Sequence, residues 1–268
     1  MKKLCMLSMS FLALQSMPVL ANSSFEYTIG SEFYKETYRE YTNGDQILMQ
    51  ERGNLWSFTG MIKYHFNPQH ALSLDGRYSK GQITYTGQGQ DENGNNTGYG
   101  SIVDHNIPRY VYNINLKYTY TLPISPTIDL LLEPGIGYRV LHDLKSRIDS
   151  EDYDRKNRLV YAHLGLGLNI NLGHNFSFSP SIAYNQLIRG RQYSFEPKEG
   201  KITHKQHNGR GIDIDLLVSK QFSNQHKLSI GPFYRSWKIF DSTVSSIDNS
   251  IEPKNRTREV GLKINYTF

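Results

Sequence analysis

The chain has 268 residues, a formal net charge of +5 and a mean hydropathy of −0.55. Beyond the first 21 residues no segment approaches about 18 consecutive apolar residues, which excludes membrane-spanning helices, and the mild positive charge does not indicate nucleic-acid binding. The only cysteine, Cys5, excludes a disulfide framework. The 19 tyrosines and 12 phenylalanines are numerous, and such rings gather where a membrane meets water.

The N-terminus has the pattern of a secretory signal. Lys2 and Lys3 precede an apolar stretch that ends in Val19-Leu20-Ala21, and small residues two positions apart suit signal peptidase. Pro18 and several polar residues interrupt the stretch, which disfavours a retained membrane helix. We therefore predict a cleaved signal peptide over residues 1–21 and one mature domain over residues 22–268, with a net charge of +3 once the two lysines are removed.

Alternation with a period of two dominates the mature chain. Aromatic and aliphatic residues hold every second position from Tyr110 to Leu122, whereas Arg109 and Lys117 lie in the opposite phase. Segments 54–66, 158–171 and 176–188 alternate in the same way. A transmembrane strand needs about 9–11 such residues, apolar toward lipid and polar or small toward a lumen. The pattern predicts an all-β, antiparallel up-and-down barrel that crosses a membrane.

The alternation predicts about ten strands. Twelve would require a hairpin hidden in a long loop, but the Asn- and Gly-rich segment 91–100 has the composition of a solvated loop. An even number returns both chain ends to one side of the membrane. Short links alternate with long polar ones, the asymmetry expected of periplasmic turns and extracellular loops. The predicted strands cover residues 25–34, 54–66, 71–85, 109–122, 128–141, 158–171, 176–188, 211–222, 227–238 and 258–268. The predicted long loops cover roughly residues 35–53, 86–108, 142–157, 189–210 and 239–257.

The last strand alternates from Val260 and ends on Tyr266-Thr267-Phe268. This ending resembles the assembly signal of outer-membrane barrels, with Tyr266 and Phe268 as its aromatic residues. The resemblance implies that the barrel-assembly machinery of a Gram-negative bacterium is a partner of this strand. It also implies an integral location in the outer membrane.

Together these features make the mature chain resemble the small outer-membrane barrels. In its number of strands it is similar to the omptin surface proteases and to the opacity-type adhesins. Omptins use an aspartate pair facing an aspartate–histidine pair at the extracellular rim. Those motifs are absent at comparable places, since Asp75-Gly76-Arg77 lies well below the rim. The segment Arg189–Tyr193 has no acid two residues before a histidine. The resemblance therefore implies a barrel without the omptin catalytic motifs, and no enzyme activity is expected.

Charged residues in the lumen phase should form a network of paired ions, because unpaired buried charges are costly. Asp213 and Asp215 share one strand face, and pairing is the favoured interpretation over acid–base chemistry. His163, Asp213 and Glu259 could also lie in one layer near the extracellular end, which leaves a rim hydrolase as the least favoured hypothesis. The predicted network comprises Asp75, Arg77, Arg109, Lys117, Glu133, Arg139, Asp213, Asp215, Arg235 and Lys263.

The fourth long link carries a local excess of positive charge. Its cations suit an acidic partner, and lipopolysaccharide phosphates are favoured over a host receptor. The residues are Arg189, Arg191, Lys198, Lys201, Lys205 and Arg210. The third link balances acids and bases, which indicates internal pairing. No His/Cys cluster or calcium-loop spacing predicts a metal, and no cofactor is expected.

A ten-stranded lumen with many long charged side chains should be mostly plugged. The sequence therefore favours a non-enzymatic surface protein whose loops contact outer-membrane lipid, lipopolysaccharide, or a host or envelope ligand. A narrow porin-like channel for small polar solutes is the alternative.

Overall fold

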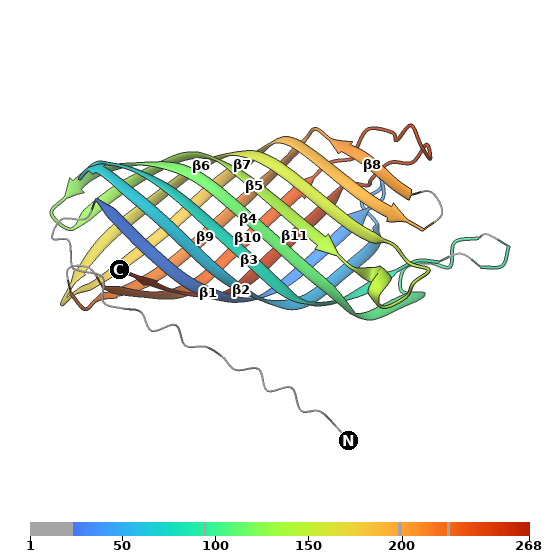
Figure 1. Ribbon diagram of the computed structural model, residues 1–268, viewed down its shortest axis with the longest axis horizontal. Helices are drawn as coiled ribbons and strands as arrows, with labels where there is room; N and C mark the ends of the chain where they lie inside the picture. The colour runs from blue at the N-terminus through green and yellow to red at the C-terminus, as the bar shows by residue number, and fades with distance from the viewer. Residues whose placement is uncertain (1–23, 90, 94, 198–199, 224–225) are drawn as a thin grey trace, which may run out of the picture.

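The computed structural model describes residues 24–89, 91–93, 95–197, 200–223 and 226–268, and the predicted signal peptide lies outside them. Strands account for most of the described chain (Figure 1), which also contains a short 3-10 turn, η1 (Lys145–Arg147). No helix in this part is long and apolar enough to cross a membrane. The strands are β1 (Phe25–Tyr41), β2 (Ile47–Asn67), β3 (His70–Gly87), β4 (Ile102–Ser125), β5 (Ile128–Asp143), β6 (Asp154–Gly173), β7 (Phe176–Glu196), β8 (Gly200–Gln206), β9 (Gly209–Gln221), β10 (Lys227–Ile239) and β11 (Asn255–Thr267).

Antiparallel pairing of neighbours closes the sheet into a barrel. β1 pairs with β11, and β6 pairs with β7, so no wall strand is left as a free edge. β8 and β9 both pair with β7 in one continuous register, because Gly190 lies opposite Gln206 and Gln186 lies opposite Arg210. Residues 207–208 therefore interrupt a single wall strand. The eleven segments form a ten-stranded barrel, which confirms the predicted fold class and strand number.

The links divide the barrel into two ends. Short links lie at one end, here called the turn end, and segments 42–46, 88–101, 144–153 and 240–254 lie at the other, the loop end. The C-terminus lies at the turn end, and segment 88–101 projects farthest from the loop end (Figure 1). Phe268 and Tyr27 exchange two backbone hydrogen bonds, of 2.9 and 3.0 Å, which pair the C-terminus with the start of β1.

The strands extend farther toward the loop end than the sequence predicted. Residues 35–41, 47–53, 102–108, 189–196 and 200–206 belong to strands, so the predicted loops over 35–53, 86–108 and 189–210 are wrong over these parts. The reason lies in the outer face, which becomes polar near the loop end. Apolar alternation therefore stops several residues before backbone pairing does.

The outer wall carries a continuous band of exposed apolar side chains. Trp56, Phe58 and Ile62 are exposed on β2, as are Val260, Leu262 and Ile264 on β11. Exposed apolar surface of this extent suits lipid rather than water. The outward phase predicted for segments 54–66, 109–122 and 258–268 matches this band.

Candidate functional site: a closed lumen between two cavities

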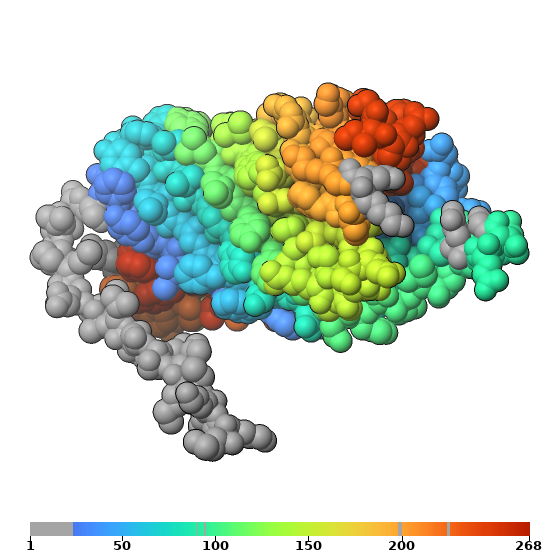
Figure 2. Space-filling model, turned by 45° about the vertical axis from the view of Figure 1, so that its right-hand side comes forward, coloured from blue at the N-terminus to red at the C-terminus, as the bar shows by residue number. Residues whose placement is uncertain are grey.

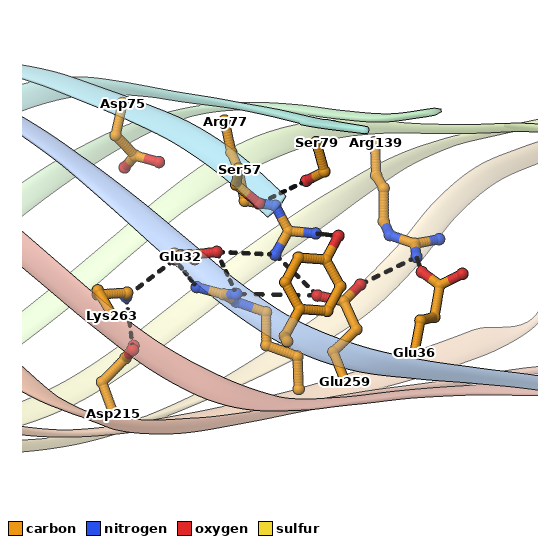
Figure 3. A network of polar contacts seen from close by, with 12 residues as sticks. Glu32, Glu36, Ser57, Asp75, Arg77, Ser79, Arg139, Asp215, Glu259 and Lys263 are labelled. Atoms are coloured by element: carbon orange, nitrogen blue, oxygen red, sulfur yellow. Dashed lines mark hydrogen bonds and ion pairs between the residues drawn. The ribbon is translucent and has the colours of Figure 1, made fainter. Parts of the chain in front are cut away.

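Glu32 of β1 is the centre of an ion network in the lumen. Its carboxylate lies 2.9 Å from Arg235 Nη2, 3.3 Å from Arg77 Nη1 and 3.6 Å from Lys263 Nζ (Figure 3). Glu32 is 1% exposed, so these three cations compensate a charge that water does not reach. Because they come from β10, β3 and β11, the network joins β1 to its wall neighbour β11 and also to β3 and β10, which do not pair with β1.

The remaining network residues pair in smaller groups. Glu259 accepts a 2.7 Å hydrogen bond from Arg77 and a 3.3 Å bond from Arg139 (Figure 3). Three further contacts involve predicted residues: Lys263 with Asp215 at 2.5 Å, Lys117 with Asp75 at 2.8 Å, and Thr119 Oγ1 with Glu133 at 2.9 Å. The structure thus brings most of the predicted set into one polar layer.

Arg109 of β4 has a different set of partners. It is 0% exposed, and its guanidinium forms ion pairs with Glu36 at 2.8 Å and with Glu51 and Asp143. These three carboxylates come from β1, β2 and β5. Sequence reasoning missed them because they fall in or at the edge of segments predicted as loops. For Glu36 a signal was present in the sequence. Glu32, Glu36 and Glu40 lie four residues apart, so all three share one face of a strand that continues past residue 34.

Apolar side chains pack inside the barrel beside Arg109, where a polar or small lumen face was predicted. The difference follows from size, because side chains alone must fill a barrel this narrow. Two buried clusters do so: Tyr34, Leu55, Ile83, Ile107, Val111, Leu141 and Phe233 form one, and Leu159, Tyr161, Leu187, Trp237 and Ile239 form the other. We call these clusters and the Arg109 ion group the barrier.

The barrier separates two cavities. A chamber of about 350 Å³ lies on the turn-end side and is lined by residues such as Glu26, Lys227 and Thr267. A rim cavity of about 470 Å³ lies on the loop-end side and is lined by Glu40 and Tyr153, among others. The two cavities share no lining residue. Along β1 the chamber residue Glu32 and the rim residue Glu40 flank Tyr34 and Glu36 of the barrier, which are each 1% exposed.

The three residues of the hydrolase hypothesis lie on the turn-end side of the barrier. Asn185 bridges two of them: its Oδ1 lies 2.7 Å from His163 Nδ1, and its Nδ2 donates to Asp213 at 2.9 Å. Glu259 belongs to the arginine network instead. Asp213 and Glu259 line the turn-end chamber and not the rim cavity.

At the rim, Arg155 joins two carboxylates from distant parts of the chain. It lies 2.5 Å from Glu252 and also pairs with Glu40. The internal pairing predicted for the third loop is therefore wrong for Arg155, although Lys145 and Asp152 do pair within that loop at 3.0 Å. Burial, together with the neighbouring Glu40 carboxylate, raises the pKa of Glu252 to about 8.

Further contacts hold segment 240–254 across the rim. His204 Nε2 of β8 lies 2.8 Å from Ser250 Oγ, and the Thr243 backbone N–H donates to the Lys205 carbonyl at 2.9 Å. Figure 2 shows this segment, in red, against the orange β8 region. No group of three or more His, Cys, Asp or Glu side chains in the described chain is arranged to hold a metal ion.

The predicted basic loop is a stretch of wall strand. Arg191 of β7 lies opposite Arg158 of β6 and Lys205 of β8, so these three cations form a row. Lys201 packs over the Tyr193 ring, and Lys198 lies outside the described residues. Arg189 is exposed at a register shift, whereas Arg210 lies on β9 opposite Lys238. The five described residues do not form one cluster.

Comparisons with known proteins concern the fold. No protein-family model matches the chain, and no curated protein matches it. The outer-membrane protease OmpT from Escherichia coli has a TM-score of 0.61 at 12% identity, covering 91% of this chain and 96% of that one. OprG from Pseudomonas aeruginosa has a TM-score of 0.39 at 11% identity, covering 91% and 95%. The NalP translocator domain from Neisseria meningitidis has a TM-score of 0.43 at 10% identity, covering 90% and 88%. The chain has the closed β-barrel fold of outer-membrane proteins.

Replacing Arg109 tests the barrier. Arg109→Met leaves three buried carboxylates without their cation, so we expect the free energy of unfolding to fall by about 3–5 kcal/mol. Urea unfolding of the refolded barrel in detergent, followed by tryptophan fluorescence, measures the change. Arg158→Met, on the exposed outer wall, should leave stability unchanged. Equal stability of the two variants would contradict the assigned role of Arg109.

The raised pKa of Glu252 predicts a pH dependence. Between pH 4.5 and about 8 the folded protein keeps a proton that the unfolded chain releases, so stability should fall as pH rises through this range. The urea midpoint should therefore be lower at pH 8.5 than at pH 5.5, and Glu252→Gln should reduce this difference. Asp149→Asn, on the exposed third loop, should retain it. An unchanged slope in Glu252→Gln would rule out Glu252 as the source.

Proposed function

We propose that this chain is a non-conducting, non-enzymatic surface protein of the outer membrane of a Gram-negative bacterium. In this proposal the turn end faces the periplasm and the loop end faces outward, in line with the usual asymmetry of link lengths. The protein acts through its rim and outer wall, in adhesion or in contacts with the cell envelope. Its C-terminal strand, which ends on Phe268, would engage the barrel-assembly machinery.

The buried Arg109 group carries this proposal. A solute passing through the lumen would have to separate Arg109 from Glu36, Glu51 and Asp143, which are all buried. It would then have to pass the apolar clusters of the barrier. Because separating buried ion pairs is costly, the resting barrel should not conduct.

The loop end offers two kinds of contact surface. The rim cavity is rich in carboxylates, among them Glu40, Asp152 and Asp248, which favours positively charged groups of a partner. The Arg158–Arg191–Lys205 row on the outer wall suits acidic groups, including lipopolysaccharide phosphates. The projecting segment 88–101 extends the reach of this end.

A narrow channel remains the alternative function, favoured by the polar chamber of about 350 Å³ at the turn end. Solutes could occupy this chamber from the periplasm, but passage would require the barrier to open. A hydrolase that uses His163, Asp213 or Glu259 has less support, because these residues lie on the turn-end side of the barrier.

Planar-bilayer recording tests the closed lumen. We expect the refolded mature chain, shown to be folded by its heat-modifiable gel mobility, to produce no discrete conductance steps because the barrier fills the lumen. A known porin inserted under the same conditions is the positive control. Steady steps that change with Lys117→Ala or Arg139→Ala, but not with Arg158→Ala, would establish the channel instead.

Shortening the projecting segment tests the action at the rim. Replacing residues 88–101 with Asn-Gly should leave the barrel folded, because strand pairing begins again at Ile102. We expect bacteria that display this variant to adhere less to epithelial monolayers than bacteria displaying the parent. The control is a variant in which His174 and Asn175, at the turn end, are replaced instead. Undiminished adherence would exclude this segment as the contact surface.

A further inference from the structure

A row of four cations crosses the outer wall near the loop end. Arg39 of β1 lies directly opposite Arg256 of β11, Arg256 lies opposite Lys238 of β10, and Lys238 lies opposite Arg210 of β9. Side chains directly opposite each other on antiparallel strands have Cβ atoms about 4.5–5.5 Å apart, and like charges in such pairs are destabilising. Four adjacent strands therefore bring together charges that repel one another.

Two more arginines form a second tier nearer the apolar band. Thr37 of β1 lies opposite Arg52 of β2 on one side and Arg258 of β11 on the other. The two tiers enclose a groove of about 180 Å³, which we call the arginine groove. Its lining residues are Thr37, Arg39, Tyr41, Gln50, Arg52, Arg256 and Arg258.

The arginine groove has no carboxylate in its lining. Within the described chain, none of its four arginines forms an ion pair with an acidic side chain. Arg39 Nε donates to Gln50 Oε1 at 2.7 Å, which leaves the rest of its guanidinium for another acceptor. Asp45, in the link that follows β1, pairs with Lys254 at 2.8 Å. The groove therefore has the charge of a site for an external anion.

Exposed apolar side chains begin below the groove on the same three strands, after the outward-facing Lys35 on β1 and Asn54 on β2. Phe33, Trp56 and Val260 are 61%, 53% and 58% exposed, and each lies two to four residues from a residue that lines the groove. A ligand that fits both surfaces carries anionic groups at the groove and hydrocarbon along the wall. A soluble anion or a sulfated glycan matches only the groove.

We propose that the arginine groove binds the phosphate groups of lipid A, the phosphorylated glycolipid part of lipopolysaccharide, while the acyl chains lie against Phe33, Trp56 and Val260. Arginine suits this role because its planar fork donates two parallel hydrogen bonds to a phosphate. Binding would also relieve the repulsion between Arg39 and Arg256. The choice of lipid A rests on the orientation proposed above, whereas the anion site itself does not depend on whether the lumen conducts.

The test compares Arg39→Gln/Arg256→Gln with Lys156→Gln/Lys220→Gln, which removes two outward-facing cations outside the groove and the row. The refolded full chains in detergent are titrated with bisphosphorylated lipid A, phosphate-free lipid A, phosphatidylglycerol and heparin. Binding is followed by native mass spectrometry for the lipids and by calorimetry for heparin. We expect the affinity for lipid A to fall at least tenfold in the groove variant and less than twofold in the control.

The other probes separate the alternatives. Phosphate-free lipid A should bind the parent at least tenfold more weakly than lipid A, and without lipid A the groove variant should be no less stable than the parent. Equal affinity of parent and groove variant for lipid A would overturn the site. If phosphatidylglycerol binds the parent as tightly as lipid A does, and the groove variant loses this binding, lipid A is the wrong ligand and the proposed orientation is in question. Groove-dependent binding of heparin alone would identify a sulfated-glycan site instead.

Discussion

Arg109 carries a positive charge inside the barrel without any exposed surface, and three carboxylates from three strands surround it. Removing charges from water costs several kcal/mol per ion, and only well-placed partners compensate that cost. β1, β2, β4 and β5 must therefore hold one relative register for this group to exist. The same group closes the lumen, so one electrostatic constraint both orders the wall and separates the two cavities.

The ion network around Glu32 and Glu259 extends this constraint toward the turn end. Arg77 contacts both carboxylates, and Arg139 reaches Glu259 while also lying 3.9 Å from Glu36. Charges thus continue from the Arg109 group to the turn-end chamber through shared partners. Because each ion pair joins different strands, the lumen stabilises the closed barrel through side chains as well as through its backbone ladder.

On the outer wall the charges are arranged differently from those in the lumen. The apolar band of this wall carries few charges, and cations appear above it on several strands, as Arg52 above Trp56 and Arg258 above Val260 illustrate. In the lumen each buried cation has a carboxylate partner, whereas the cations of the arginine groove have none within the described chain. The proposed lipid site follows from this contrast, because the counter-charge missing from the protein can come from the membrane.

The sequence by itself determined the ten wall strands, their antiparallel order and the outward phase of the apolar residues. Alternation along a strand is local, so it can be read from neighbouring residues such as Tyr110 and Tyr112. It also placed Arg109, Arg139 and Asp213 in the lumen. Only the tertiary structure decided which charges pair, because Arg109 and Glu36 are 73 positions apart and their contact depends on strand tilt and barrel diameter. It likewise decided the strand ends near the loop end, where pairing continues after the apolar pattern stops, and the juxtaposition of Arg39 with Arg256, which exists only once the first and last strands meet.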